Sequence, residues 1–317
     1  MSHPLNYDSA MNELIEAGLD VSDGLRLNEV KPHRVRQVGD PSKKFRAWTA
    51  LRTSKGNGGT YIVGTYGVFS GAETSRHILH APVGAGIMVD RDVMADLETL
   101  RILELQDQQM AAKDAVDAWS ELVEPKERHP YAIKKKIGMP GAMVPESGTS
   151  MIIALRDIRG NIKALQGISP DGEKMLWPRG AAKRGAFHMI GDPAEHSIIL
   201  IAEGYATAAT VSMCCNLPTA FAVDAGNLAP VAISLRQKYP WHEIIICADD
   251  DYQSPGSPGE KAAIKAALAC YGEYVLPDFS GFERNGETDF NDLMILANSK
   301  KIVERQILGI HNENSKA

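Results

Sequence analysis

Two clusters of acidic residues follow apolar runs near the middle of the 317-residue chain. The first run ends in Glu203, and the second ends in Asp249, Asp250 and Asp251. In an α/β sheet, residues that directly follow the buried strands lie at the carboxyl edge of the sheet. This edge is where such sheets bind ligands and carry catalytic residues. Carboxylates gathered at one edge repel one another unless a cation lies between them, and hard oxygen ligands favour Mg²⁺ or Mn²⁺. The pattern therefore predicts a divalent metal site at a sheet edge.

The segments that carry these acids alternate between strand and helix patterns. After Glu203, the turn residue Gly204 leads into an Ala-rich helical stretch at 205–215. Further on, the sequence predicts strands at 217–223, 243–248 and 273–276 and helices at 228–238 and 259–271. This alternation is typical of a mostly parallel sheet flanked by helices.

The order of the acidic motifs resembles the Toprim domain. Glu203 opens the hexapeptide Glu-Gly-Tyr-Ala-Thr-Ala, and three motifs follow it: Asp-Ala-Gly-Asn at 224–227, Asp-Asp-Asp at 249–251 and Thr-Asp-Phe-Asn-Asp-Leu at 288–293. The hexapeptide is similar to the active-site motif in the primase domain of satellite-phage alpha-type primase-helicases, a group that includes conjugative-plasmid primases. We therefore expect an α/β Toprim fold with a preceding α+β subdomain and a small N-terminal, mainly antiparallel β domain.

The resemblance implies two Mg²⁺ or Mn²⁺ ions, with Glu203, Asp249 and Asp251 as the catalytic carboxylates. The metal-binding set that we expect is Glu203, Asp249, Asp250, Asp251 and Asp289. Because alternate residues of an extended chain face opposite sides, Asp250 is expected behind the other two aspartates of its triplet. Glu203 acts either as a metal ligand or as a proton acceptor, and both roles stay open.

The expected function is that of a DNA primase, which makes short RNA primers from ribonucleoside triphosphates on a single-stranded DNA template in phage or plasmid replication. Two alternatives stay open. A Toprim nuclease would use the same carboxylates to hydrolyse a phosphodiester, and a non-catalytic single-stranded DNA-binding or replication-inhibiting protein would keep the fold without using it. The intact Glu203, Asp249 and Asp251 argue against the second alternative.

Composition indicates an ordinary soluble protein, with 44% hydrophobic residues. No stretch approaches the ~18 apolar residues of a membrane span, and the N-terminus lacks a signal pattern, so we expect a cytoplasmic protein without a membrane partner. The four cysteines lack Cys-x-x-Cys spacing, and no zinc is expected. Many Toprim primases carry a zinc ribbon and the alpha-type proteins continue into a helicase. Since neither is found in this sequence, a separate replicative helicase is the expected partner.

The net charge of −6 is distributed unevenly. Residues 31–80 contain nine Lys and Arg against two Asp and Glu, and residues 126–190 contain twelve against five. Residues 191–317 reverse this balance, with nine against seventeen. Such polarity suits a protein that grips a phosphate backbone with one part and performs metal chemistry with another. Solvated faces that alternate in sign are the alternative interpretation.

The basic N-terminal segment is predicted to form an antiparallel sheet, because β-prone runs at 46–52 and 60–69 flank a Gly-rich turn at 55–59. Its candidate DNA-binding residues are Arg34, Arg36, Arg46, Arg52 and Trp48. Cations interleaved with aromatic faces are used to hold single strands. An aromatic core under a solvated basic face is the alternative.

Further phosphate contacts are expected close to the acidic clusters. The loop 177–185 contains Arg179, Lys183 and Arg184, which are suited to cradle a triphosphate or a template phosphate. A plain solvated loop is the alternative. Lys261 lies near the start of the helix that follows the aspartate triplet, where backbone amides also favour a phosphate.

The chain divides by pattern into four segments. We expect an N-terminal accessory domain at 1–90, a connecting helix at 91–128, an N-terminal subdomain of the catalytic core at 129–190 and the Toprim domain at 191–317. The break at 124–130 contains two prolines and ends the long polar helix. His129 is expected to cap the next element, with a nucleotide contact as the alternative.

Overall fold

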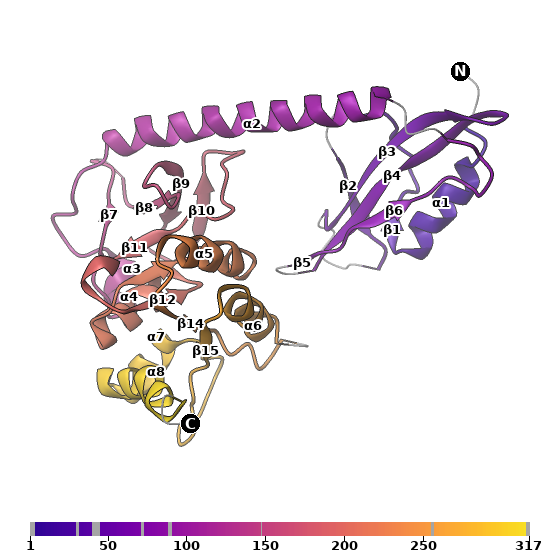
Figure 1. Ribbon diagram of the computed structural model, residues 1–317. Coiled ribbons are helices and arrows are strands. Elements are labelled where there is room, and N and C mark those ends of the chain that lie inside the picture. The colour runs from indigo at the N-terminus through magenta and orange to yellow at the C-terminus, as the bar shows by residue number, and fades with distance from the viewer. Residues whose placement is uncertain are drawn as a thin grey trace. The chain divides into compact units, whose positions relative to one another are not determined.

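The computed structural model of the chain describes residues 4–29, 32–39, 45–70, 73–87, 91–146, 148–254 and 257–314 (Figure 1). The chain divides into two compact units, Met1–Leu105 and Gln106–Ala317. This division is coarser than the four segments expected from the sequence, whose boundaries stay a prediction.

The first unit is a helix packed on an antiparallel sheet. Its elements are α1 Tyr7–Glu16, β1 Leu19–Asp20, β2 His33–Gln37, β3 Ala47–Gly56, β4 Gly59–Ser70, β5 Glu73–Thr74 and β6 His77–Leu79. The strand order is β1-β2-β3-β4-β5 with β6 also on β4, and the pairings between these strands are antiparallel. Gly58 turns the β3–β4 hairpin at φ +82°, a conformation that favours glycine. The antiparallel sheet expected from the sequence is confirmed.

The segment that leads into the acidic half of the chain forms a second antiparallel sheet. Its elements are α2 Arg91–Ser120, α3 Pro130–Lys134, β7 Ala142–Met143, β8 Met151–Arg156, β9 Ile162–Ile168 and β10 Lys174–Trp177, with strand order β10-β9-β8-β7. Ala115 of α2 packs with Ala154 and Leu165 on one face of this sheet. At the start of α3, Nδ1 of His129 accepts a hydrogen bond from the Tyr131 amide at 3.3 Å, so the expected capping role of His129 is confirmed.

The acidic C-terminal segment, residues 188–314, forms a five-stranded sheet in the order β11-β13-β12-β14-β15. Its elements are β11 His188–Ile190, η1 Pro193–Glu195, β12 Ile198–Ala202, α4 Tyr205–Cys215, β13 Thr219–Phe221, α5 Ala225–Lys238, β14 Glu243–Cys247, α6 Pro258–Cys270, β15 Glu273–Val275, α7 Phe290–Ala297 and α8 Lys300–Asn314. Only β11 pairs antiparallel among these described strands. The mostly parallel sheet predicted from the alternating pattern is therefore confirmed.

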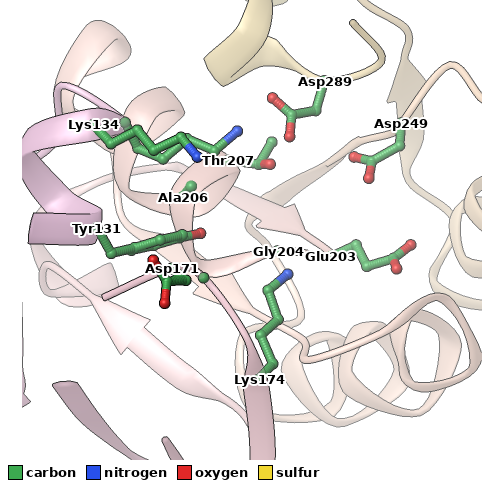
Figure 2. Close-up of a pocket in the computed structure, with 12 residues that line it drawn as sticks. Tyr131, Lys134, Asp171, Lys174, Glu203, Gly204, Ala206, Thr207, Asp249 and Asp289 are labelled. Atoms are coloured by element: carbon green, nitrogen blue, oxygen red, sulfur yellow. The ribbon is translucent and has the colours of Figure 1, made fainter. Parts of the chain in front are cut away.

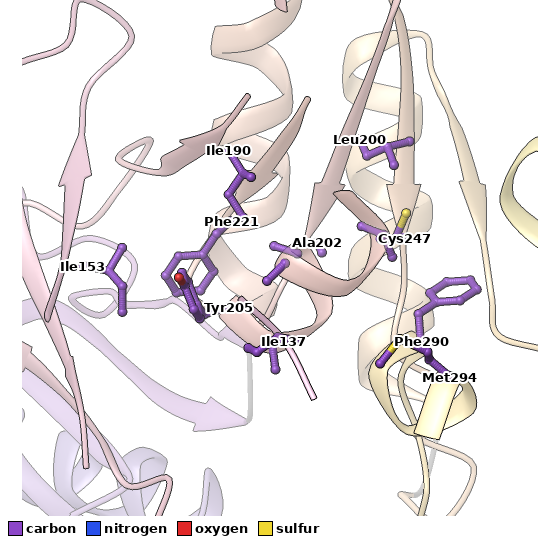
Figure 3. Packing of buried hydrophobic residues seen from close by; sticks show 14 of the residues in the cluster. Ile137, Ile153, Ile190, Leu200, Ala202, Tyr205, Phe221, Cys247, Phe290 and Met294 are labelled. Carbon is purple, nitrogen blue, oxygen red and sulfur yellow. The ribbon is translucent and has the colours of Figure 1, made fainter. Parts of the chain in front are cut away.

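Helices cover both faces of this sheet, and the pattern of buried residues explains how. Helices α5 and α6 pack on one face, with Leu228 and Ala263 in the same cluster as Ile246. On the other face, α4, α7 and α8 pack in a cluster that also includes residues of β8 and β9 (Figure 3). The ring of Tyr205 meets that of Phe221 edge-on at 5.7 Å between centroids. Most residues of α4 are buried. A helix that is enclosed on all sides has no face in contact with water, which explains why α4 is apolar all round.

In the described part of the chain, no helix combines the length and the apolar character needed to cross a lipid bilayer.

Candidate active site

The acidic residues lie at the carboxyl edge of the two central strands. β12 and β14 are parallel neighbours, with Ala202 opposite Cys247, so the chain leaves both strands at the same edge. Glu203 follows β12 directly, and Asp249 follows β14 after one further residue. Figure 2 shows Glu203 and Asp249 on one side of a cavity, with Asp289 above them. The edge placement predicted from the two apolar runs is confirmed.

Burial makes the charged forms of these carboxyl groups costly. Burial, followed by repulsion from Asp224 and Asp251, raises the pKa of Glu203 to about 7. Burial, followed by repulsion from Asp289 and Glu203, raises the pKa of Asp249 to about 8. Acids whose pKa values are shifted by burial and by like charges in a cavity are candidates for a functional site. A bound cation would restore their ionised forms.

One oxygen of Asp249 indicates that these carboxylates can bind a divalent cation. Its Oδ1 is buried and has no hydrogen-bond partner in the part of the chain that the structure describes. Leaving such an atom unsatisfied costs ~1–3 kcal/mol, and a metal ion would satisfy it. Among the described residues, no three His, Cys, Asp or Glu side chains form a complete metal cluster by themselves. Mg²⁺ commonly binds one or two carboxylates and completes its shell with water and phosphate oxygens, so this donor set fits it.

The other two aspartates of the triplet have different partners. Oδ2 of Asp251 accepts a hydrogen bond from the amide of Gly259 at 3.1 Å. A Cβ atom at Gly259 would lie 2.8 Å from that oxygen, so the first turn of α6 can approach Asp251 only because residue 259 is a glycine. Oδ2 of Asp250 accepts from Nη1 of Arg284 at 2.7 Å, which gives this carboxylate a protein cation as its partner. The role of Asp250 as a metal ligand stays a prediction.

Asp289 is held at the start of α7. Its Oδ1 accepts a hydrogen bond from the amide of Asp292 at 2.9 Å, as an N-cap residue does. Burial raises the pKa of Asp289, while the hydroxyl of Thr207 and the amide of Asp292 favour its charged form. The capping bond fixes the direction of the carboxylate, which lines the same cavity as Glu203 and Asp249.

The cavity itself has a volume of about 260 Å³ and is lined by groups of both signs. Its acidic members include Glu203, Asp249 and Asp289, and its basic members are Lys134, Lys135 and Lys174. Figure 2 shows Lys134 with Tyr131 on the side away from Glu203, and Lys174 reaching up from β10. Sequence reasoning missed these lysines. The run of three lysines at 134–136 after the capping histidine was the available signal.

The basic residues predicted from the sequence lie elsewhere. Lys183 forms an ion pair with Asp224, the residue before α5. Arg179, Arg184 and Lys261 are exposed. None of these four predicted residues lines the 260 Å³ cavity described above, so their role in nucleotide or template binding stays a prediction.

The candidate DNA-binding residues of the first unit share one face of its sheet. Arg34 pairs directly with Trp48 across β2 and β3, whereas their neighbours Val35 and Ala47 pair on the face that packs on α1. Alternate residues of a strand face opposite sides, so the predicted cations and the indole share the second face. Trp48 is only 9% exposed.

Other cations of this face contact aromatic rings. The guanidinium of Arg76 lies 6.0 Å from the centre of the Trp48 ring. The guanidinium of Arg36 lies 5.4 Å from the centre of the exposed Phe45 ring. Arg34, Arg36 and Arg46 are exposed and Arg52 is half-buried. The basic face is therefore present, but its tryptophan offers little open surface for stacking.

Part of the acidic C-terminal segment matches a known protein family. Residues 198–299 match the Toprim domain family. This segment runs from the start of β12 to just past α7 and contains every carboxylate of the expected metal-binding set. Residues 198–299 form a Toprim domain. The Toprim fold expected from the sequence is confirmed.

Two curated relatives extend the similarity beyond the Toprim domain. The chain is 35% identical over 147 residues to a DNA primase TraC of Escherichia coli, a match that covers 44% of this chain and 14% of the relative. It is 33% identical over 178 residues to a second DNA primase TraC of Escherichia coli, covering 54% of this chain and 12% of the relative. The matches thus span less than one sixth of the length of these relatives.

Two solved structures are also similar. The primase fragment of the bacteriophage T7 primase-helicase protein is 18% identical, with a TM-score of 0.39, over 56% of this chain and 69% of that chain. The DnaG primase catalytic domain bound to single-stranded DNA is 14% identical, with a TM-score of 0.41, over 65% of this chain and 80% of that chain.

Proposed function

We propose that this protein is a DNA primase that makes short RNA primers from ribonucleoside triphosphates on single-stranded DNA. The similarity to two proteins named DNA primase TraC supports this proposal. The observation that carries it is the cavity at the edge of the Toprim domain, where half-buried carboxylates face lysines. This lining suits a nucleoside triphosphate bound with a divalent cation, because lysines can bind its phosphates and carboxylates can bind its metal ion.

Glu203, Asp249 and Asp251 would hold the divalent ions. When bound, Mg²⁺ or Mn²⁺ lowers the pKa of the attacking 3′-hydroxyl and offsets the negative charge that develops on the leaving pyrophosphate. Asp249 contributes its unpartnered Oδ1. Glu203 acts as a ligand or as the acceptor of the hydroxyl proton, and both roles require the carboxylate form. With a pKa of about 7 in the metal-free protein, Glu203 is poised to lose its proton when a cation arrives.

The lysines bind the triphosphate. Lys134 and Lys174 are exposed side chains at the cavity, so each can turn its ammonium group toward a phosphate oxygen. Lys174 also interacts electrostatically with Glu203 and Asp249, whose charged forms it favours. Lys174 would therefore bind the part of the triphosphate that shares the metal with Glu203 and Asp249. Lys135 has a second task, because it forms an ion pair with Asp292.

The finer features of the function are part of the same proposal. A role in phage or plasmid replication follows from the resemblance to conjugative-plasmid and satellite-phage primases, and a separate replicative helicase is the proposed partner. The single-stranded template is assigned to the basic face of the first unit, with Arg34, Arg36 and Arg46 as exposed cations. Template contact by Arg179, Arg184 or Lys261 near the Toprim domain remains part of this proposal.

One experiment separates primase from the two alternatives. The protein is incubated with labelled ribonucleoside triphosphates, single-stranded DNA carrying a different label, and Mg²⁺. New labelled oligoribonucleotides that depend on both template and Mg²⁺ are expected. Shortened DNA without new RNA would instead support a nuclease, and unchanged DNA that migrates as a protein complex would support a binding protein.

A further inference from the structure

Two loops carry the aspartates of the expected metal-binding set, while Glu203 follows β12. The first follows β14 and contains Asp249, Asp250 and Asp251, and the second lies between β15 and α7 and ends at Asp289. One side chain of the second loop, Arg284, reaches the first loop. Both loops belong to the Toprim domain, so their mutual arrangement decides where its carboxylates stand.

Arg284 is bonded to both loops at once. Its Nη1 donates to Oδ2 of Asp250 at 2.7 Å, and its Nη2 donates to the Asp250 carbonyl oxygen at 3.3 Å. Within its own loop, Nη2 and Nε donate to the carbonyl oxygen of Glu287 at 2.7 and 3.1 Å. The side chains of Arg284 and Asp250 are 19% and 27% exposed, so this ion pair is less screened by water than a surface pair.

Two aromatic rings contact the same guanidinium. The Arg284 carbon Cζ lies 3.8 Å from the centre of the Tyr252 ring and 4.2 Å from the centre of the Phe279 ring. Tyr252 belongs to the first loop and Phe279 to the second. Arginine is the cation suited to this place, because its planar group stacks on rings while its edge donates several hydrogen bonds.

These contacts fix the backbone on both sides of Asp250. The amide of Asp250 donates to the carbonyl oxygen of Thr288 at 2.7 Å, and its carbonyl oxygen accepts from Arg284. Because each peptide unit is planar, the first bond fixes the plane shared with Asp249 and the second fixes the plane shared with Asp251. Thr288 in turn precedes Asp289. The backbones of Asp249, Asp251 and Asp289 are thereby linked to Asp250 and Arg284.

We propose that Arg284 and Asp250 are a positioning pair, which holds Asp249 and Asp251 in register with Asp289 for binding of the divalent cation. This inference rests on the metal chemistry of the proposed function. Neither residue lines the cavity that we assign to the nucleotide. The pair sets the separation of the ligand carboxylates, and Asp250 acts through Arg284 instead of through the metal.

The test measures Mn²⁺ binding by calorimetry, separately from primer synthesis. Arg284→Lys keeps the charge but loses the planar group, and Asp250→Asn keeps the shape but loses the charge. Arg305→Lys, at an exposed position of α8, is the matched control. Groups that orient metal ligands typically contribute ~10–100-fold to metal affinity or activity. We expect Arg284→Lys to weaken Mn²⁺ binding at least ~10-fold, Asp250→Asn to weaken it less, and the control to bind as wild type.

Further readouts separate positioning from a general structural role. We expect kcat for primer synthesis to fall with Mn²⁺ affinity while KM for the nucleotides changes less than ~3-fold, since the lysines are untouched. The double variant is expected to be no worse than Arg284→Lys alone, because both changes break one unit. A lower melting temperature with unchanged Mn²⁺ affinity of the folded molecules would assign Arg284 a structural role only and would overturn the proposal.

The outcomes also distinguish this inference from the proposed function. If the wild type makes no primers but both variants lose Mn²⁺ affinity, the positioning pair stands and the primase proposal fails. If the wild type makes primers and both folded variants bind Mn²⁺ and react normally, the positioning pair fails and the primase proposal stands. Absence of Mn²⁺ binding by the wild type would overturn the pair as well, because no ligand set would need positioning. Should Arg284→Lys fail to fold, Asp250→Asn alone decides by the same measurement.

Discussion

Nζ of Lys135 lies 3.1 Å from Oδ1 of Asp292, and this ion pair joins α3 to α7 across the edge of the Toprim domain. Beside it, the side-chain amide of Asn291 donates to the carbonyl oxygen of Lys135 at 2.7 Å and to Oγ1 of Thr210 at 2.8 Å. The segment before the Toprim domain is therefore bonded to α7, the helix that Asp289 caps. This connection holds the basic side of the cavity against its acidic side.

The Lys135 ion pair is expected to stabilise the fold. Lys135→Met leaves the carboxylate of Asp292, only 22% exposed, without its cation, and this should lower the free energy of unfolding by ~1–3 kcal/mol. Urea unfolding followed by circular dichroism measures the change. Lys134→Met is the matched control, because Lys134 is exposed, and its stability should stay within ~0.5 kcal/mol of the wild type. Equal stability of both variants would contradict the role of Lys135.

The exposed lysines of the cavity are expected to act on nucleotide binding. Lys134→Met and Lys174→Met each remove a cation from a phosphate contact, and a charged hydrogen bond is worth ~1.5–3 kcal/mol. We therefore expect KM for ribonucleoside triphosphates to rise ~10-fold or more, with little change in stability. Steady-state primer synthesis against nucleotide concentration measures this. Lys301→Met, at an exposed position of α8, should behave as wild type. Unchanged KM in both cavity variants would remove the lysines from the triphosphate site.

The raised pKa values of Glu203 and Asp249 predict how stability depends on pH. Without metal, the native protein keeps protons on these groups up to about pH 7 and 8, whereas the unfolded chain releases them near 4.5 and 3.8. The native state thus binds more protons in this range, so the free energy of unfolding should fall as pH rises from about 4 through 8. Each unit by which a native pKa exceeds its unfolded value contributes ~1.4 kcal/mol to this decrease.

Thermal or urea unfolding at pH 5.5 and pH 8.5 in the presence of a chelator measures this decrease. Glu203→Gln removes one titrating group and should flatten the profile. Saturating Mg²⁺ should restore stability mainly at the higher pH, because the ion binds the ionised native carboxylates. If the wild type and Glu203→Gln show identical pH profiles, Glu203 does not titrate as its burial requires.

Much of the architecture of the Toprim domain could be predicted from local pattern. The Ala-rich stretch after Gly204 predicted a helix at 205–215, and α4 has those bounds. The apolar run before the aspartate triplet predicted a strand at 243–248, and β14 is Glu243–Cys247. These predictions succeed because strand and helix periods differ and because each acid ends an apolar run.

The parts of the site that depend on tertiary packing could not be predicted. Arg284 lies 34 residues beyond Asp250, and no local pattern connects them. Lys174 stands in a polar stretch of the sequence. It lines the cavity only because β10 lies next to the sheet edge that carries Glu203. The sequence predicted Trp48 among the cations of the basic sheet, but the arginine that lies over its ring, Arg76, comes from beyond β5.

The basic face of the first unit is predicted to bind the template. Replacing Arg34, Arg36, Arg46 and Arg52 together by Ala should weaken binding of a labelled single-stranded oligonucleotide. It should also flatten the salt dependence of binding by ~0.7 for each phosphate that the protein no longer neutralises. Binding titrations over a range of salt concentrations measure the slope. The Toprim carboxylates are unchanged, so high template concentration should restore much of the primer synthesis. If the wild type and the four-arginine variant show the same salt dependence, this face does not bind the template. Template binding would then be assigned to Arg179 and Arg184.

Trp48 gives a contrasting prediction in the same unit. Because it is 9% exposed, Trp48→Ala should lower the stability of the sheet, as truncation of a buried aromatic residue does by ~3–5 kcal/mol. An exposed stacking residue would instead lose ~1–3 kcal/mol of binding per base with little effect on folding. Unfolding and binding measured on the same variant distinguish the two. Normal stability with weaker DNA binding would contradict the buried position.

Glu203 and Asp249 are proposed to form the metal-dependent centre of a primase. Template-dependent RNA synthesis should be compared for the wild type, Glu203→Gln, Asp249→Asn and the control Glu195→Gln, which changes an exposed residue of η1. Since each of the first two variants removes metal-binding charge at nearly constant volume, both should lose ~10²-fold or more of the rate while the control keeps it. Asp250→Asn should lose less than Asp249→Asn. Near-normal synthesis by Glu203→Gln or Asp249→Asn at saturating Mg²⁺ would contradict the account.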